Sequence, residues 1–184
     1  MMRFFISFII LSTSLISSIS FAKEDCRIAP LQMQDEPRLV QDFFIGNCHY
    51  RNQDYARAAT QWNKVLNTAP PNGPFNEMQI NSMNNLGFLL FNGLEIKPDQ
   101  QKALSLWHKA SKAGQAESTY HLCHAYARPD TPQFNTIKAK IYCNKAEQQY
   151  AQLDEDEHQQ EIDEINQILE ELKKITSSVM LHLH

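Results

Sequence analysis

Four cysteines are the residues of this chain that are most able to do chemistry: Cys26, Cys48, Cys123 and Cys143. An even number of cysteines favours disulfides in an oxidising compartment. Four cysteines allow three pairings, and their spacing alone does not choose between them. Two alternatives stay open: four buried thiols, or a zinc site in which Cys123 and Cys143 join His121 and His124, which a helix would present three residues apart. No Cys-x-x-Cys pair occurs, so disulfides are favoured over zinc.

Outside the cysteines, the 184 residues offer no catalytic motif. Gly-x-Ser-x-Gly, a phosphate-binding loop and His-Glu-x-x-His are all missing. His182 and His184 cannot build a metal site alone. The 21 Asp and Glu supply many carboxylate pairs, but a hydrolase also needs a closed cleft, which repeat arrays rarely present. We expect no enzymatic activity, no catalytic residue, no cofactor and no metal. The net charge of -4 excludes a broadly basic nucleic-acid-binding surface.

Residues 1–22 have the pattern of a secretory signal peptide. Arg3 precedes an apolar stretch that Ser and Thr dilute, and Ser20-Phe21-Ala22 puts small residues at the two positions that a signal peptidase inspects. We predict cleavage before Lys23, with an uncleaved membrane anchor as the alternative. Lys-Glu-Asp before Cys26 does not fit a lipidation site. The prediction is a periplasmic or secreted protein that does not insert into a membrane after cleavage.

Three segments of the chain repeat one another, and the later two are 36 residues apart. Gly87 is followed 36 residues later by Cys123, and Ala103 by Ala139. Small residues at 46, 87 and 123 are expected where a first helix approaches a second. Alanines at 58, 103 and 139 are the small residues on the facing side of the second helix. Trp62 and Trp107, four residues after such an alanine, are expected to fill the space between units. Each helix pair leaves an apolar face open, so neighbouring pairs must stack.

These positions resemble the tetratricopeptide repeat superfamily. Residues 39–72 look like one tetratricopeptide repeat, and 80–115 and 116–153 look like two repeats of its Sel-like branch. The second unit departs from the family pattern at Leu90 and at Glu95, where Gly is usual, and the third at Cys123 and Cys143. The resemblance implies an all-α, right-handed solenoid of three helix hairpins, preceded by an N-terminal segment over 23–38. His108 is expected on the outer face of its helix.

The same resemblance implies a disulfide pairing. In the family pattern the positions of Cys123 and Cys143 are near neighbours on the two helices of one hairpin. A disulfide there would replace the usual Gly–aromatic contact. Cys26 would then pair with Cys48 and tie the N-terminal segment to the first helix. Each bridge is worth about 2–4 kcal/mol of stability.

Residues 154–184 are predicted to form an acidic, amphipathic C-terminal helix. No Pro or Gly occurs after Asn135, so the preceding helix can run on into this one. The apolar stripe consists of Ile162, Ile165, Leu169, Leu172 and Val179. We expect it to cap the last repeat, with a homodimeric coiled coil as the alternative. Residues 154–171 carry nine acids and no Lys or Arg, which is either a solvated face or an arm that meets a basic partner.

The resemblance also implies a concave groove lined by the first helix of each unit. The matching residues are Phe43, Asn47, Tyr50 and Arg51 in unit one, Asn84, Phe88 and Phe91 in unit two, and Tyr120, His124 and Arg128 in unit three. Aromatic side chains with Arg and Asn are typical of protein-binding surfaces. We therefore predict a non-catalytic protein-protein interaction module of the bacterial periplasm. The alternatives are an immunity protein that neutralises a periplasm-acting toxin, an adaptor with several weak partners, and a secreted factor that meets a host protein.

Overall fold

A computed structural model describes residues 23–27, 33–68, 76–153 and 157–181. The predicted signal peptide and its cleavage site, the acids at 154–156 and the terminal histidines lie outside the described residues. The helices are α2 (Arg38–Arg51), α3 (Tyr55–Thr68), α4 (Asn76–Asn92), α5 (Gln100–Lys112), α6 (Ala116–Ala127), α7 (Thr136–Leu153) and α8 (Gln159–Leu181). The described part contains no strand, so the predicted all-α class is confirmed.

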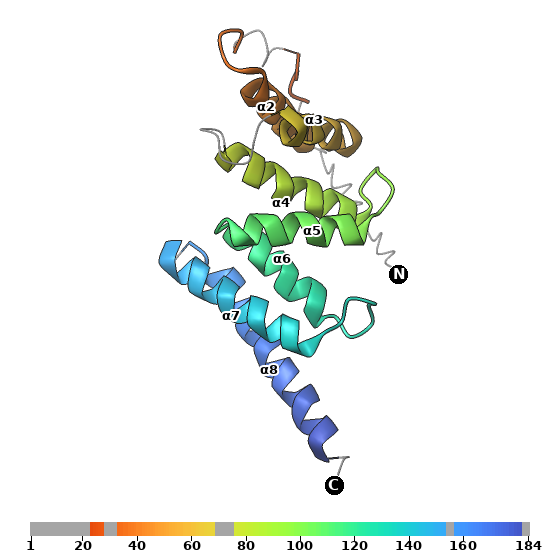
Figure 1. Cartoon of the computed structure of the whole chain (residues 1–184), viewed down its shortest axis with the longest axis vertical. Coiled ribbons are helices and arrows are strands. Elements are labelled where there is room, and N and C mark those ends of the chain that lie inside the picture. Colours follow the sequence, from red (N-terminus) through yellow and green to blue (C-terminus); the bar gives the residue numbers. More distant parts are fainter. Residues whose placement is uncertain (1–22, 28–32, 69–75, 154–156, 182–184) are drawn as a thin grey trace, which may run out of the picture.

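The helices stack as three hairpins, α2–α3, α4–α5 and α6–α7, followed by α8 (Figure 1). Neighbouring hairpins meet through α3 and α4, then through α5 and α6. The backbones of consecutive first helices, α2, α4 and α6, also approach one another, whereas those of consecutive second helices do not. The stack therefore curves toward the first helices, which line its inner face. This is a helical repeat solenoid, as the resemblance implied.

A glycine and a tryptophan hold each of the first two hairpins together. A Cβ atom added at Gly46 would lie 2.6 Å from Nε1 of Trp62, and one at Gly87 would lie 2.5 Å from Nε1 of Trp107. The tryptophans were expected to fill the space between units; each does belong to a core cluster with residues of the next unit, but its tightest contact is with the glycine of its own hairpin. They pack inside their own hairpins because the glycine removes the side chain that would keep the two helices apart. Trp107 also reaches the next unit, where its ring lies 4.8 Å from that of His121.

The third hairpin replaces this contact with a disulfide between Cys123 and Cys143. The two cysteines are 20 residues apart, the same spacing as Gly87 and Trp107. Both are fully buried. Because their sulfurs are bonded to each other, the zinc alternative that used both side chains does not fit this structure.

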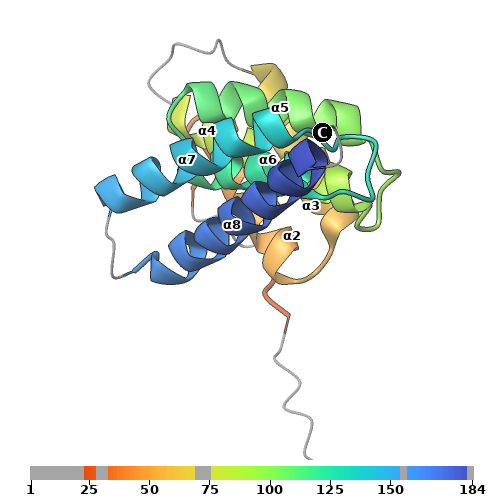
Figure 2. The same cartoon turned by 90° about the horizontal axis from the view of Figure 1, so that it is seen from below.

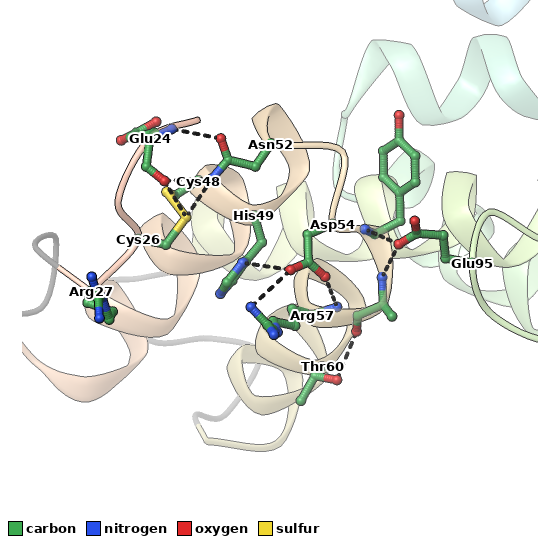
Figure 3. A network of polar contacts seen from close by, with 12 residues as sticks. Glu24, Cys26, Arg27, Cys48, His49, Asn52, Asp54, Arg57, Thr60 and Glu95 are labelled. Atoms are coloured by element: carbon green, nitrogen blue, oxygen red, sulfur yellow. Dashed lines mark hydrogen bonds and ion pairs between the residues drawn. A yellow bond between two sulfur atoms is a disulfide. The ribbon is translucent and has the colours of Figure 1, made fainter. Parts of the chain in front are cut away.

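The second disulfide, Cys26–Cys48, anchors residues 23–27 to α2. Asn52 strengthens the attachment: its side chain accepts the N–H of Glu24 at 2.9 Å and donates to the carbonyl of Glu24 at 2.7 Å. Arg51 adds an ion pair with the Glu24 carboxylate at 2.7 Å. Figure 3 shows the disulfide and the Asn52 contacts at the end of α2. Both disulfides of the implied pairing are therefore present in the structure.

The sequence suggested that the last helix continues α7. The structure shows two separate helices instead. α7 ends at Leu153, and α8 begins at Gln159 and packs along both α6 and α7 (Figure 2). The reversal buries the apolar stripe: Ile165 and Leu172 are fully buried and Ile162 is nearly so. One continuous helix would have carried that stripe into solvent. The side chain of Val179 lies outside the description. No helix in the described ranges combines the length and apolar character that crossing a membrane requires.

Candidate protein-binding surface

The inner face carries most of the residues that the resemblance assigned to a groove. Tyr50 is 39% exposed, and Arg51 and Arg128 are also exposed. The half-buried members are Asn47, Phe88, Phe91, Tyr120 and His124. Two assignments need correction, because Phe43 is only 8% exposed and Asn84 only 2%. Phe43 belongs to the apolar core and Asn84 to a buried polar contact, so neither offers surface to a partner.

Several inner-face side chains are fixed by contacts within the protein. Asn47 accepts the indole N–H of Trp62 at 3.1 Å, and Tyr50 packs its ring 5.6 Å from the same indole. Phe88 lies 5.6 Å from the ring of His121, which joins the inner faces of α4 and α6. A surface fixed in this way loses little conformational entropy when a partner binds.

His108, expected on the outer face of its helix, is held by the third hairpin. Its ring lies between two hydroxyls of the third hairpin, 2.8 Å from that of Tyr126 and 3.0 Å from that of Tyr142. His108 therefore links α5 to α6 and α7. Burial lowers the pKa of this histidine, and the charge of Lys138 lowers it further.

Where the inner face meets α8, the structure forms a cleft of about 580 Å³. We call it the α6–α8 cleft; it is lined by the start of α6, the end of α7 and the start of α8. Tyr120 and Tyr150 supply aromatic walls, and Glu117, Glu161 and Glu164 supply carboxylates. Tyr120 is a predicted groove residue, so the cleft is continuous with the inner face.

Histidines and tyrosines surround the carboxylates of the α6–α8 cleft. The Tyr120 hydroxyl donates a hydrogen bond to Glu164, and Nε2 of His124 lies 3.9 Å from the same carboxylate. Nε2 of His121 lies 3.7 Å from Glu117, and Nδ1 of His158 lies 3.8 Å from Glu161. The two contacts of Glu164 hold the start of α8 against α6, whereas the other two pairs lie within α6 and at the start of α8.

The contacts set the protonation of the cleft. The nearby His121 imidazole is the largest effect on Glu117 and lowers its pKa, and the Tyr120 hydrogen bond lowers that of Glu164. Burial lowers the pKa of His124 below its usual value, so this ring is neutral at pH 7. Burial and the Glu164 charge raise the pKa of Tyr120, which stays protonated. The cleft is therefore anionic at neutral pH and suited to binding a cation.

Sequence reasoning missed most of this cleft. Glu161 and Glu164 were noticed only as members of an acidic run, and His121 only as a zinc candidate. Glu117 and Tyr150 carried no signal, because they acquire a role only when α8 folds back. Asn84, predicted as a groove residue, lies one layer behind the cleft and donates a hydrogen bond to Glu117 at 2.8 Å.

Comparison with known proteins identifies the repeat type. Residues 80–115 and 116–149 each match the Sel1 repeat, so this part of the chain consists of two Sel1 repeats. Sel1 repeats generally mediate protein–protein interaction and are typically non-catalytic. Searches of curated proteins and of solved structures gave no match.

Proposed function

We propose that this chain with two Sel1 repeats is a non-catalytic protein-binding module of the bacterial periplasm that takes a partner protein on its inner face. The observation that carries the proposal is the set of aromatic side chains on that face. Tyr50, Phe88 and Tyr120 come from α2, α4 and α6 in turn, and each keeps part of its ring accessible. Aromatic anchors spaced along a concave surface are typical of protein recognition.

The two disulfides support export, because such bonds persist in oxidising compartments. They lie in the first and third hairpins and so stabilise both ends of the stack. A binding face held rigid in this way suits one tight partner better than several weak ones. This favours the immunity-protein alternative, in which the chain neutralises a toxin that acts in the periplasm, over an adaptor or a host-interacting factor.

The test is affinity capture with residues 23–184 from envelope extract of the source organism, with bound proteins identified by mass spectrometry. An inner-face variant, Tyr50→Ala with Arg128→Ala, is compared with a matched variant on exposed positions of the second helices, Ile141→Ala with Lys109→Ala. We expect one stoichiometric partner that withstands high salt and is lost only from the inner-face variant.

Other results would change the assignment. Several partners released by salt would favour an adaptor over an inhibitor. A partner lost equally from both variants, or from neither, would contradict binding on the inner face. Growth experiments separate the inhibitor further, since deleting an immunity protein harms only cells that also encounter its toxin.

A further inference from the structure

The α6–α8 cleft has acidic side chains in its lining but no Lys or Arg, unlike the cleft beside the N-terminal segment. The acids of the α6–α8 cleft are Glu117, Glu161 and Glu164. The cleft beside the N-terminal segment also contains three acids, but Lys23 and two arginines line it as well. There, Asp25 pairs with Arg27 at 2.8 Å and Asp54 pairs with Arg57 at 3.2 Å. The charges of the N-terminal cleft are balanced by Lys and Arg within the chain, and those of the α6–α8 cleft are not.

Within the described residues, the ion-pair partners of the three cleft carboxylates are histidines alone. These are His121 for Glu117, His158 for Glu161 and His124 for Glu164. None of the three partners is a Lys or Arg, whose positive charge is fixed at neutral pH. Three carboxylates thus line one partly enclosed site with no Lys or Arg among them, and a cation that enters the site gains their combined attraction.

The residues that line the walls of the cleft indicate which kind of cation it can bind. The rings of Tyr120 and Tyr150 lie 6.1 Å apart at a steep angle, and Leu153, 65% exposed, adds apolar surface at the rim. A guanidinium group stacks on aromatic faces and bonds carboxylates through two N–H groups at once. Its aliphatic stem covers apolar surface. A small hydrated metal ion would use neither the rings nor the leucine.

We propose that the α6–α8 cleft binds an arginine side chain, presented by a basic segment of the partner protein. The inference rests on the proposed function, since it names the chemistry that the partner brings to the C-terminal end of the inner face. Glu161 and Glu164 bind the guanidinium from α8, Glu117 from α6, and Tyr120 stacks against it. Two acids of the run at 154–171, Glu161 and Glu164, would thus bind the arginine at the start of α8.

The test uses a defined probe, the acetylated and amidated peptide Gly-Arg-Gly-Arg-Gly, titrated into isotopically labelled residues 23–184 and followed by NMR. The same peptide with citrulline in place of arginine is the neutral control of equal shape. We expect saturable shifts around Tyr120 and Glu164 with the arginine peptide only. They should weaken as salt rises above about 0.15 M, because added ions screen the attraction.

Two charge-matched double variants locate the site. Glu161→Gln with Glu164→Gln removes two charges inside the cleft, and Glu170→Gln with Glu171→Gln removes two from exposed positions of the same helix. We expect the first to weaken peptide binding about tenfold and the second less than about twofold. If the first double variant unfolds, Glu161→Gln alone leaves the Tyr120–Glu164 hydrogen bond in place and should weaken binding about threefold.

Three results would overturn the inference: no shift with the arginine peptide, equal binding of the citrulline peptide, or equal losses in the two double variants. The last would mean that the overall charge of α8 attracts the peptide. Failure here is distinct from failure of the proposed function. A partner captured equally well by the cleft variant would leave the binding module intact and refute the arginine site.

Discussion

The carboxylate of Glu95 accepts the backbone N–H of Tyr55 at 2.9 Å, although the two residues are 40 positions apart. Tyr55 is the first residue of α3, and Glu95 lies in the loop of the next hairpin. The same oxygen lies 3.4 Å from the N–H of Ala56, and Asp54 accepts the N–H of Arg57 at 3.3 Å. Figure 3 shows Asp54 and Glu95 together at this helix end. The N-terminus of α3 is thus capped partly by the neighbouring unit.

This contact predicts an unusual order of stability among variants of Glu95. The residue has φ +54, a left-handed conformation that costs a non-glycine residue about 1–2 kcal/mol. Glu95→Ala keeps that cost and loses the cap, so we expect the free energy of unfolding to fall by about 1 kcal/mol. Glu95→Gly loses the cap but relieves the backbone, so its net change should be small. Urea unfolding of the two variants measures the difference, and a glycine variant no better than the alanine variant would contradict this account.

The Gly87–Trp107 contact predicts that adding one methyl group at position 87 lowers the free energy of unfolding. In Gly87→Ala the new Cβ would lie 2.5 and 2.8 Å from two atoms of a buried indole, which has nowhere to move. Alanine gains about 1 kcal/mol in helix propensity, but overpacking outweighs it, and we expect a net loss of about 1–3 kcal/mol. The control is Gly87→Ala in a Trp107→Leu background, which removes the indole atoms that the new Cβ would meet. An equal loss in both backgrounds in thermal or urea unfolding would mean that packing against the indole does not set the cost at position 87.

The buried Asn84 side chain should stabilise the stack through its hydrogen bonds to the next repeat. Its side chain accepts the hydroxyl of Ser118 at 2.8 Å and donates to Glu117 at 2.8 Å. Asn84→Ala leaves the fully buried Ser118 hydroxyl without this acceptor, so we expect a loss of about 1–3 kcal/mol in urea unfolding. Asn92→Ala is the control, because that exposed amide bonds only to its own helix. A loss below about 0.5 kcal/mol for Asn84→Ala would show that the buried contact does not matter for stability.

Histidine burial predicts that the protein is less stable in mild acid. Burial is the main cause that lowers the pKa values of His49, His108 and His124 below the ordinary 6.5. The unfolded chain therefore binds more protons than the folded protein near pH 6, and the free energy of unfolding falls as the pH drops from 7.5 to 5.5. His108→Gln, which keeps a donor and an acceptor for the two tyrosines, should reduce this slope. Urea unfolding at several pH values tests it, and an unchanged slope would contradict the assignment to His108.

The repeats were predictable because their signals are local. Gly87, Trp107 and the two cysteines of the third hairpin have family-defined spacings of about 20 residues, and small residues have few other reasons to recur at those positions. The α6–α8 cleft was not predictable in the same way. Tyr120 and Glu164 meet across 44 residues, and only the return of α8 brings them together. The amphipathic stripe indicated that α8 must cover something, but the same stripe also fitted a dimer, and periodicity carries no information on direction.

Both disulfides close short loops that do not overlap along the chain, one of 22 residues and one of 20. Each joins cysteines that are consecutive in the sequence. A chain that enters an oxidising compartment from its N-terminus therefore forms the correct bonds simply by joining each new cysteine to the one before it. In such a chain Cys26 would already be paired before Cys123 entered the compartment. The order of entry would therefore favour this one pairing of the three.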